Sequence, residues 1–140
     1  MRRALLADTE IRETFSLFGQ LTIALLGIGS LAQGETSRLL YGGLIDDDSR
    51  TGLLARGAVG DVLSYVYDQG GAILNSAASD RMIAISPPQL LAVPHRVGVA
   101  TGKAKATAIA GALAGGLVNV LVTDSQAAGA ICSDLPGDTP

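Results

Sequence analysis

The chain has 140 residues, of which 48% are hydrophobic and 16% are charged, and its formal net charge at pH 7 is −3. This composition is typical of one globular domain and argues against a disordered chain. The acidic balance also argues against direct nucleic-acid binding, because affinity for a phosphate backbone comes from clustered Lys and Arg. One Cys and one His supply neither an internal disulfide nor a closed zinc site, so we expect no metal and no other cofactor.

The most apolar run, residues 21–32, is too short to cross a bilayer, which needs about 20 residues. The N-terminal sequence MRRALLADTEIRE begins with basic residues, but acidic residues follow before any long apolar stretch, unlike a secretion signal. We therefore expect no membrane partner and a cytoplasmic location, which suits a single unpaired Cys132.

The first part of the chain predicts a helical start and a buried strand. Residues 3–19 carry apolar residues at spacings of three and four, which predicts an amphipathic helix or two helical pieces, the second capped by Asp8 or Thr9. Residues 21–28 form a continuous apolar run with β-branched members, the pattern of a strand buried on both faces of a parallel sheet. Residues 29–52 read as a long polar excursion.

The middle of the chain predicts shorter elements. Residues 51–56 suit a short helix, 58–68 a strand, and 69–71 a turn. A short β-like run follows at 81–86, and the two prolines at its end begin a helix over 87–93. The acidic run 46–48 lacks the Gly and the distal Glu of an EF-hand and is interpreted as a solvated loop.

The last third predicts a β-α-β-α unit: a strand at 96–102, a helix at 103–116, a buried strand at 117–124 and a helix at 125–131 capped by Asp124 or Ser125. This order predicts the α/β class with a parallel, Rossmann-like sheet. Ligands of such sheets bind beyond the carboxyl ends of the strands. The expected ligand-facing positions are therefore 27–30, 100–105 and Asp124.

Three segments are candidate binding sites. Gly102, Lys103 and Lys105 precede a helix, where free N–H groups and an ammonium suit a phosphate, although solvated lysines in a plain turn fit the spacing equally well. The run GIGSLAQG, which starts at Gly27, allows a ligand close to the backbone, or it is only a tight turn. Asp61 in GAVGDV suits sugar hydroxyls, while a capping or surface role is the commoner one. His95 is interpreted as a surface residue and Cys132 as a small core residue.

Several segments, taken in order, resemble one family. They are ALLGIGSL, GAVGDV with a following YDQGG, RMIAIS, PPQLLAVPHRVGVATG, KATAIAGALAGGLVNVLVTD and SQAA. Between Ala4 and Ile131 they are similar to the sugar-binding effector domain of SorC/DeoR-type bacterial transcriptional regulators. The resemblance implies a fold like that of ribose-5-phosphate isomerase and glucosamine-6-phosphate deaminase. It also implies that a phosphorylated sugar is sensed and not converted, and that binding alters oligomer geometry and the grip of a helix-turn-helix on operator DNA.

The resemblance also implies site residues. Lys105 would contact the sugar or its phosphate, Asp61 would hold sugar hydroxyls, and the pocket floor and turn would be formed by Gly27, Gly29, Ser30 and Gly102. The family commonly has two glycines where this chain has Thr101 and Gly102, and an acidic residue near Lys103. We interpret 1–140 as a single, partial domain that lacks the N-terminal half with its phosphate loop and the helix-turn-helix.

Three functions follow from these patterns. The first is an effector-binding module, which is not an enzyme and forms a homo-oligomer through sheet surfaces left uncovered. The second is a sugar-phosphate isomerase or deaminase with Asp61 as base and Lys105 as anion clamp, for which no second catalytic group is evident. The third is an oligomerisation module without a ligand.

Overall fold

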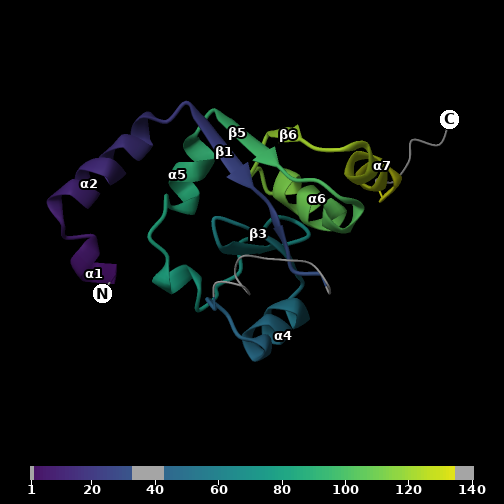
Figure 1. The fold of residues 1–140 in the computed structure, drawn as a ribbon, viewed down its shortest axis with the longest axis horizontal. Helices are drawn as coiled ribbons and strands as arrows, with labels where there is room; N and C mark the ends of the chain where they lie inside the picture. Colours follow the sequence, from purple (N-terminus) through teal and green to yellow (C-terminus); the bar gives the residue numbers. More distant parts are fainter. Residues whose placement is uncertain (1, 33–42, 135–140) are drawn as a thin grey trace.

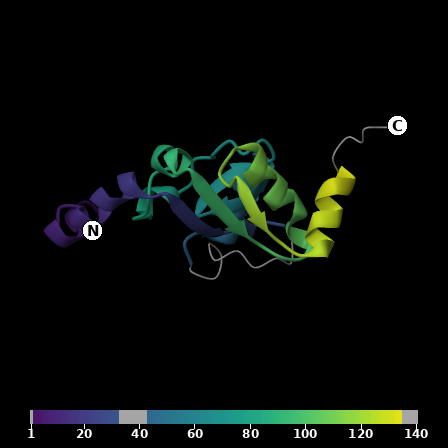
Figure 2. The same cartoon turned by 90° about the horizontal axis from the view of Figure 1, so that it is seen from above.

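The structure is a computed structural model that describes residues 2–32 and 43–134. Its N-terminal part is helical, in two pieces as predicted: α1 (Arg2–Leu5) and α2 (Thr9–Ser16), followed by a 3-10 turn, η1 (Leu17–Gln20). The Asp8 carboxylate caps α2 by accepting hydrogen bonds from the backbone N–H groups of Glu10 and Ile11 at 3.0 and 3.3 Å. Figures 1 and 2 show this helical arm at one end of the molecule, with helix α7 (Ser125–Asp134) at the other.

A parallel sheet of three strands confirms the predicted α/β class. Its strands are β1 (Ile23–Gly27), β5 (His95–Val99) and β6 (Val120–Val122), in the order β1-β5-β6. Leu25 pairs with Val97, and Val97 pairs with Val120, so the three carboxyl ends meet at one edge.

The predicted β-α-β-α unit is also present. After β5 comes a 3-10 turn, η3 (Lys103–Lys105), which leads into α6 (Ala106–Ala114), and β6 leads into α7 (Ser125–Asp134). The chain leaves α6 through Gly115 and Gly116, and Gly116 has a φ of 66°, as at many helix ends. Asp124 caps α7, because its Oδ1 accepts a hydrogen bond from the Ala127 N–H at 2.8 Å.

A second sheet lies beside the first (Figure 1) and is antiparallel, with the order β2-β3-β4. Its strands are β2 (Gly29–Ser30), β3 (Ala58–Val62) and β4 (Tyr65–Asp68). The prediction of one strand over 58–68 was wrong, because Leu63 and Ser64 have φ values of 52° and 65° and turn the chain back. Such hairpin turns usually contain Asn or Gly, and this sequence offers neither there.

Three further predictions were wrong in the middle of the chain. Helix α4 (Asp47–Ala55) begins before residue 51, because the Asp46 carboxylate caps it by accepting from the Ser49 N–H at 2.8 Å. Its first turn carries the acidic residues that the sequence suggested were a loop, and the helix dipole favours them there. The run 81–86 forms no strand: it links η2 (Ser79–Arg81) to α5 (Pro87–Ala92), and its Ile85 packs singly into the core.

The main core lies on one face of the parallel sheet. There, Leu26 and Ile109 of α6 belong to one cluster of buried apolar side chains, and Gly98 faces Val118 and Ile28 of that cluster. Side chains alternate across a strand, so every second residue of these strands points to the other face of the sheet. That face is also apolar, but it is exposed. Its exposed residues are Ile23 (61%), Leu25 (74%), Val99 (40%), Val120 (42%) and Val122 (53%).

The prediction that residues 21–28 are buried on both faces was therefore wrong, and so was the prediction of a buried strand at 117–124. The main core is assembled on one side of these strands, so alternate side chains remain exposed on the other. Cys132 was also misplaced in the core, because it lies on the exposed surface of α7. Across the part of the chain that the structure describes, every helix is too short or too polar to cross a bilayer.

Candidate functional site

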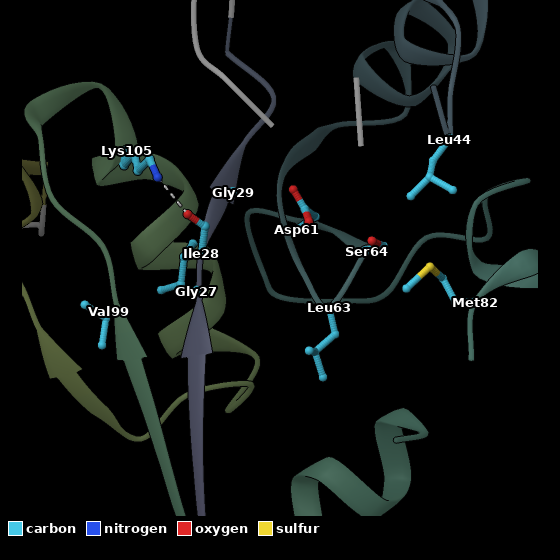
Figure 3. A pocket seen from close by; sticks show the side chains of 10 residues that line it. All are labelled: Gly27, Ile28, Gly29, Leu44, Asp61, Leu63, Ser64, Met82, Val99 and Lys105. Carbon is cyan, nitrogen blue, oxygen red and sulfur yellow. Dashed lines mark hydrogen bonds between the residues drawn. The ribbon is translucent and has the colours of Figure 1, made fainter. Parts of the chain in front are cut away.

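The candidate site is a cavity of about 630 Å³ at the carboxyl end of β1, between the parallel sheet and the β3–β4 hairpin. Strand β1 supplies backbone to its floor, η3 supplies a lysine, and the hairpin supplies a carboxylate (Figure 3). Its lining consists of Gly27, Ile28, Gly29, Leu44, Asp61, Leu63, Ser64, Met82, Val99 and Lys105.

Lys105 provides the positive charge. It lies in η3, and its Nζ donates a hydrogen bond to the Ile28 carbonyl oxygen at 3.0 Å, across to the end of β1 (Figure 3). An ammonium has three N–H donors, and this contact uses one of them. The contact therefore holds the ammonium at the cavity, where it can also meet an anionic group of a ligand.

Asp61 provides the negative charge and is 7% exposed. Its strand partner is Gly29, and a Cβ built on Gly29 would lie 2.0 Å from Asp61 Oδ1. Glycine is therefore required at 29 if the carboxylate is to keep this position. A carboxylate accepts hydrogen bonds only, which suits the hydroxyl groups of a sugar.

The Asp61 carboxylate also affects the pKa of Tyr67, which lies in the neighbouring strand β4. Burial raises the pKa of Tyr67, and the negative charge of Asp61 raises that pKa further. The phenol therefore stays protonated and donates a hydrogen bond to the Ala108 carbonyl oxygen of α6 at 2.9 Å. This contact joins β4 of the hairpin to α6, and β4 pairs with β3, the strand that carries Asp61.

The opposite wall is mostly apolar. In Figure 3, Leu44, Leu63 and Met82 lie on the far side of Asp61 from Lys105, and Ser64 adds one hydroxyl. Leu63 and Ser64 owe their place in the cavity to the left-handed backbone of their turn. A small molecule with several hydroxyls, an anionic end and a C–H face matches these walls.

The structure brings four of the six predicted residues to this cavity: Gly27, Gly29, Asp61 and Lys105. Ser30 and Gly102 are near in sequence but do not line it. The buried Ser30 hydroxyl accepts from the Ala32 N–H at 3.2 Å, and the Gly102 N–H donates to Asp124 Oδ2 at 3.0 Å. Both therefore support the surrounding backbone, and Asp124 acts in the same way.

Sequence reasoning missed the apolar wall. Leu44 and Met82 come from segments without a recognisable pattern, and the turn at Leu63 and Ser64 lacks its usual residues. Lys103, the other lysine of the turn, is exposed and faces a different groove between α6 and α7. His95 is exposed, as predicted.

Residues 2–32 and 43–134 contain no group of three or more His, Cys, Asp or Glu side chains that could hold a metal ion.

Known regulators match most of the chain. Residues 1–133 match the model of a protein family described as "Putative sugar-binding domain". The transcriptional regulator LsrR of Escherichia coli (strain K12) is 38% identical over 110 residues, which are 78% of this chain and 35% of LsrR. The sorbitol operon regulator of Klebsiella pneumoniae is 32% identical over 130 residues, which are 91% of this chain and 40% of that regulator.

Solved structures agree with these matches. The crystal structure of the full-length sorbitol operon regulator SorC from Klebsiella pneumoniae superposes with a TM-score of 0.80 at 28% identity, over 91% of this chain and 41% of SorC. A DeoR family transcriptional regulator from Listeria monocytogenes superposes with a TM-score of 0.82 at 25% identity, over 94% of this chain and 52% of that one.

The chain thus spans 35% and 40% of the length of these curated relatives. The family model covers nearly all of this chain, and the named relatives are SorC, LsrR and DeoR-type regulators. The chain belongs to the family of sugar-binding domains found in these transcriptional regulators.

Proposed function

We propose that this chain is the effector-binding module of a bacterial transcriptional regulator, and that it senses a phosphorylated sugar in the cavity at the end of β1. In this proposal residues 1–140 form part of one effector domain. Binding of the sugar is coupled to the binding of operator DNA by a helix-turn-helix, which lies on another domain. The module works in the cytoplasm as a homo-oligomer. The family match and the regulator names of the relatives support this reading.

The observation that carries the proposal is the meeting of Lys105 and Asp61 at one cavity. The two groups lie on either side of Gly29 (Figure 3), so a ligand can place unlike ends against them. A phosphate is anionic and has several acceptor oxygens, so it suits the ammonium of Lys105. The sugar hydroxyls can donate hydrogen bonds to the carboxylate of Asp61. The apolar wall then packs against the sugar's C–H groups.

We infer that the module binds its ligand without converting it. Isomerisation or deamination of a sugar phosphate needs a positioned base and an acid that act on the same substrate. Among the described residues that line the cavity, the ionisable ones are Asp61 and Lys105. Lys105 is held as a hydrogen-bond donor by the Ile28 carbonyl oxygen, which suits binding of an anion better than transfer of a proton.

Thermal unfolding of the whole chain with a panel of phosphorylated sugars tests the proposal. A ligand at 100 times its Kd stabilises the native state by about 2.7 kcal/mol, which raises the Tm by several degrees. We expect a stabilising sugar phosphate, a smaller shift with the matching unphosphorylated sugar, and no product by NMR after prolonged incubation.

The variant Lys105→Ala should abolish the shift. Lys103→Ala is the matched control, because Lys103 belongs to the same turn but is exposed and faces another groove. The proposal is wrong if no sugar phosphate shifts the Tm, or if both variants respond like the unchanged protein. Turnover of a stabilising ligand would favour the isomerase or deaminase reading.

A further inference from the structure

The hairpin turn at the cavity has an unusual backbone. Leu63 and Ser64 have φ values of 52° and 65°, and among the residues that the structure describes they are the only ones other than glycine with a positive φ. This conformation is unfavourable for residues with a Cβ, because the Cβ crowds the backbone carbonyl. Both residues line the candidate cavity. Unfavourable backbone of this kind collects at functional sites, so the turn calls for a functional explanation.

The two turn residues differ in what else holds them there. Leu63 also packs against the main core, so core packing accounts for a large apolar residue at this position. Ser64 is polar and partly buried, and its hydroxyl makes no hydrogen bond to the other residues that line the cavity (Figure 3). Glycine or asparagine would suit the backbone at 64 better. The packing of the hairpin therefore does not explain a serine at this position.

The turn is held in place by its neighbours. Val62 pairs with Tyr65 across the hairpin, and the Tyr65 hydroxyl donates a hydrogen bond to the Ile85 carbonyl oxygen at 3.2 Å. The Ile85 side chain packs into the main core. The Ser64 hydroxyl thus has a defined place at the cavity before a ligand binds, and a polar group that is already positioned loses little freedom on binding.

We propose that Ser64 is a specificity-determining residue, and that its hydroxyl and the Asp61 carboxylate together bind one hydroxyl group of the sugar. The two residues lie three positions apart in the hairpin, and both line the cavity. A carboxylate only accepts hydrogen bonds, whereas a serine hydroxyl also donates them. One ligand hydroxyl can therefore donate to Asp61 and accept from Ser64.

This pair selects a ligand that carries a hydroxyl group at the end away from Lys105. A ligand with a C–H group in that place would give the Ser64 hydroxyl no partner, and a polar group without a partner lowers the affinity. The inference rests on the proposed function, because it assumes a sugar whose phosphate lies at Lys105. In this arrangement Lys105 selects the phosphate and Ser64 selects the sugar.

Thermal unfolding without ligand tests the backbone argument. Ser64→Gly removes the Cβ, so the Tm should rise by about 2 °C or more, whereas Ser64→Ala keeps the Cβ and should change the Tm by less than about 1 °C. An unchanged or lower Tm in Ser64→Gly would mean that the turn suits serine as well as glycine. The argument that serine is kept there for the ligand would then be overturned.

Titration calorimetry tests the role in binding. The probes are inorganic phosphate, the sugar phosphate that most stabilises the unchanged protein in a panel that includes D-ribose 5-phosphate and D-glucose 6-phosphate, and the monodeoxy analogues of that sugar phosphate. Ser64→Ala and Ser64→Gly should each bind the sugar phosphate about fivefold more weakly, as loss of one hydrogen bond predicts. Both variants should bind inorganic phosphate like the unchanged protein. One monodeoxy analogue should bind all three proteins equally, because the hydroxyl that Ser64 binds is already missing.

Two controls separate this inference from the proposed function. Ser133→Ala makes the same change at an exposed serine of α7 and should leave the affinity unchanged. Lys105→Ala should abolish binding of the sugar phosphate. If it does so while the Ser64 variants bind like the unchanged protein, this inference is wrong and the proposed function stands.

Two further outcomes would also overturn the role of Ser64. An equal loss of inorganic phosphate binding in Ser64→Ala would mean that the variant distorts the whole cavity, so that Ser64 does not act on the sugar alone. If no probe binds the unchanged protein, the proposed function and this inference fail together.

Discussion

Leu25 and Leu26 are neighbours in β1, yet Leu25 is 74% exposed and Leu26 only 5%. The same contrast divides the whole parallel sheet: one face packs into the main core with α6, and the other is open. Both faces are aliphatic, which is the pattern of strands covered on both sides. The comparison teaches that the sequence of these strands suits a sheet with a packing layer on each face. The described residues of one chain supply the layer on one face only.

The largest expected effect is a difference in the free energy of unfolding between alanine variants of these two leucines. Leu26→Ala should lower the free energy of unfolding by about 2–5 kcal/mol, because it leaves a cavity in the core. Leu25→Ala should change it by less than about 0.5 kcal/mol in the monomer, since an exposed side chain loses little. Urea unfolding at protein concentrations low enough to dissociate any dimer measures both values. Equal losses in the two variants would mean that the open face is covered within one chain.

The sequence predicted the parts of this comparison that depend on local signals. The β-α-β-α order, the caps Asp8 and Asp124 and the glycines after α6 follow from residue types at fixed places. The cavity followed from a general rule, that ligands meet the carboxyl ends of parallel strands. The family resemblance named Lys105 and Asp61, and the structure places both in the lining of one cavity. That these two residues bind a ligand stays a prediction.

The rest could not be predicted because it depends on partners distant in sequence. The exposure of Val120 and Val122 depends on which elements pack against β6, and their apolar character is compatible with either answer. The turn at Leu63 and Ser64 adopts positive φ without Asn or Gly, so tertiary packing overrides the local preference. The apolar wall of the cavity, formed in part by this turn, was therefore missed.

Two glycines near the cavity differ in the space that surrounds them, and this difference allows a second comparison. A Cβ at Gly27 would meet nothing within 4 Å, whereas one at Gly29 would lie 2.0 Å from Asp61 Oδ1. Gly29→Ala should therefore displace the carboxylate and cost about 1–3 kcal/mol of stability, as overpacking does. Gly27→Ala should cost less than about 0.5 kcal/mol. Urea unfolding of both variants provides the comparison.

Gly29→Ala also tests the role of the carboxylate in binding. Since this variant moves Asp61, it should remove the thermal shift given by a sugar phosphate, whereas Lys103→Ala, whose side chain faces another groove, should retain it. If Gly29→Ala binds like the unchanged protein, Asp61 does not hold the ligand where we propose.

The smallest expected effect concerns Tyr67, which is fully buried between the hairpin and α6. Near neutral pH, Tyr67→Phe loses one hydrogen bond and should lower the free energy of unfolding by about 1 kcal/mol. The pH dependence of the free energy of unfolding is a more specific test of this buried phenol. The folded-state pKa of this phenol is raised above its ordinary value of 10.0 by burial and by the charge of Asp61. Its contribution to stability is therefore fully present below pH 10 and is lost as the pH rises further, because the unfolded chain ionises first.

The unchanged protein should accordingly lose up to about 1.4 kcal/mol per pH unit above pH 10 that Tyr67→Phe does not lose. Urea unfolding of both proteins between pH 8 and 11 measures this, and the difference between them cancels the titration of the lysines. The two stabilities should be about 1 kcal/mol apart at pH 8 and converge near pH 11. Parallel curves would mean that the phenol reaches solvent, and that the hairpin carrying Asp61 is less firmly packed on α6 than its 2.9 Å hydrogen bond indicates.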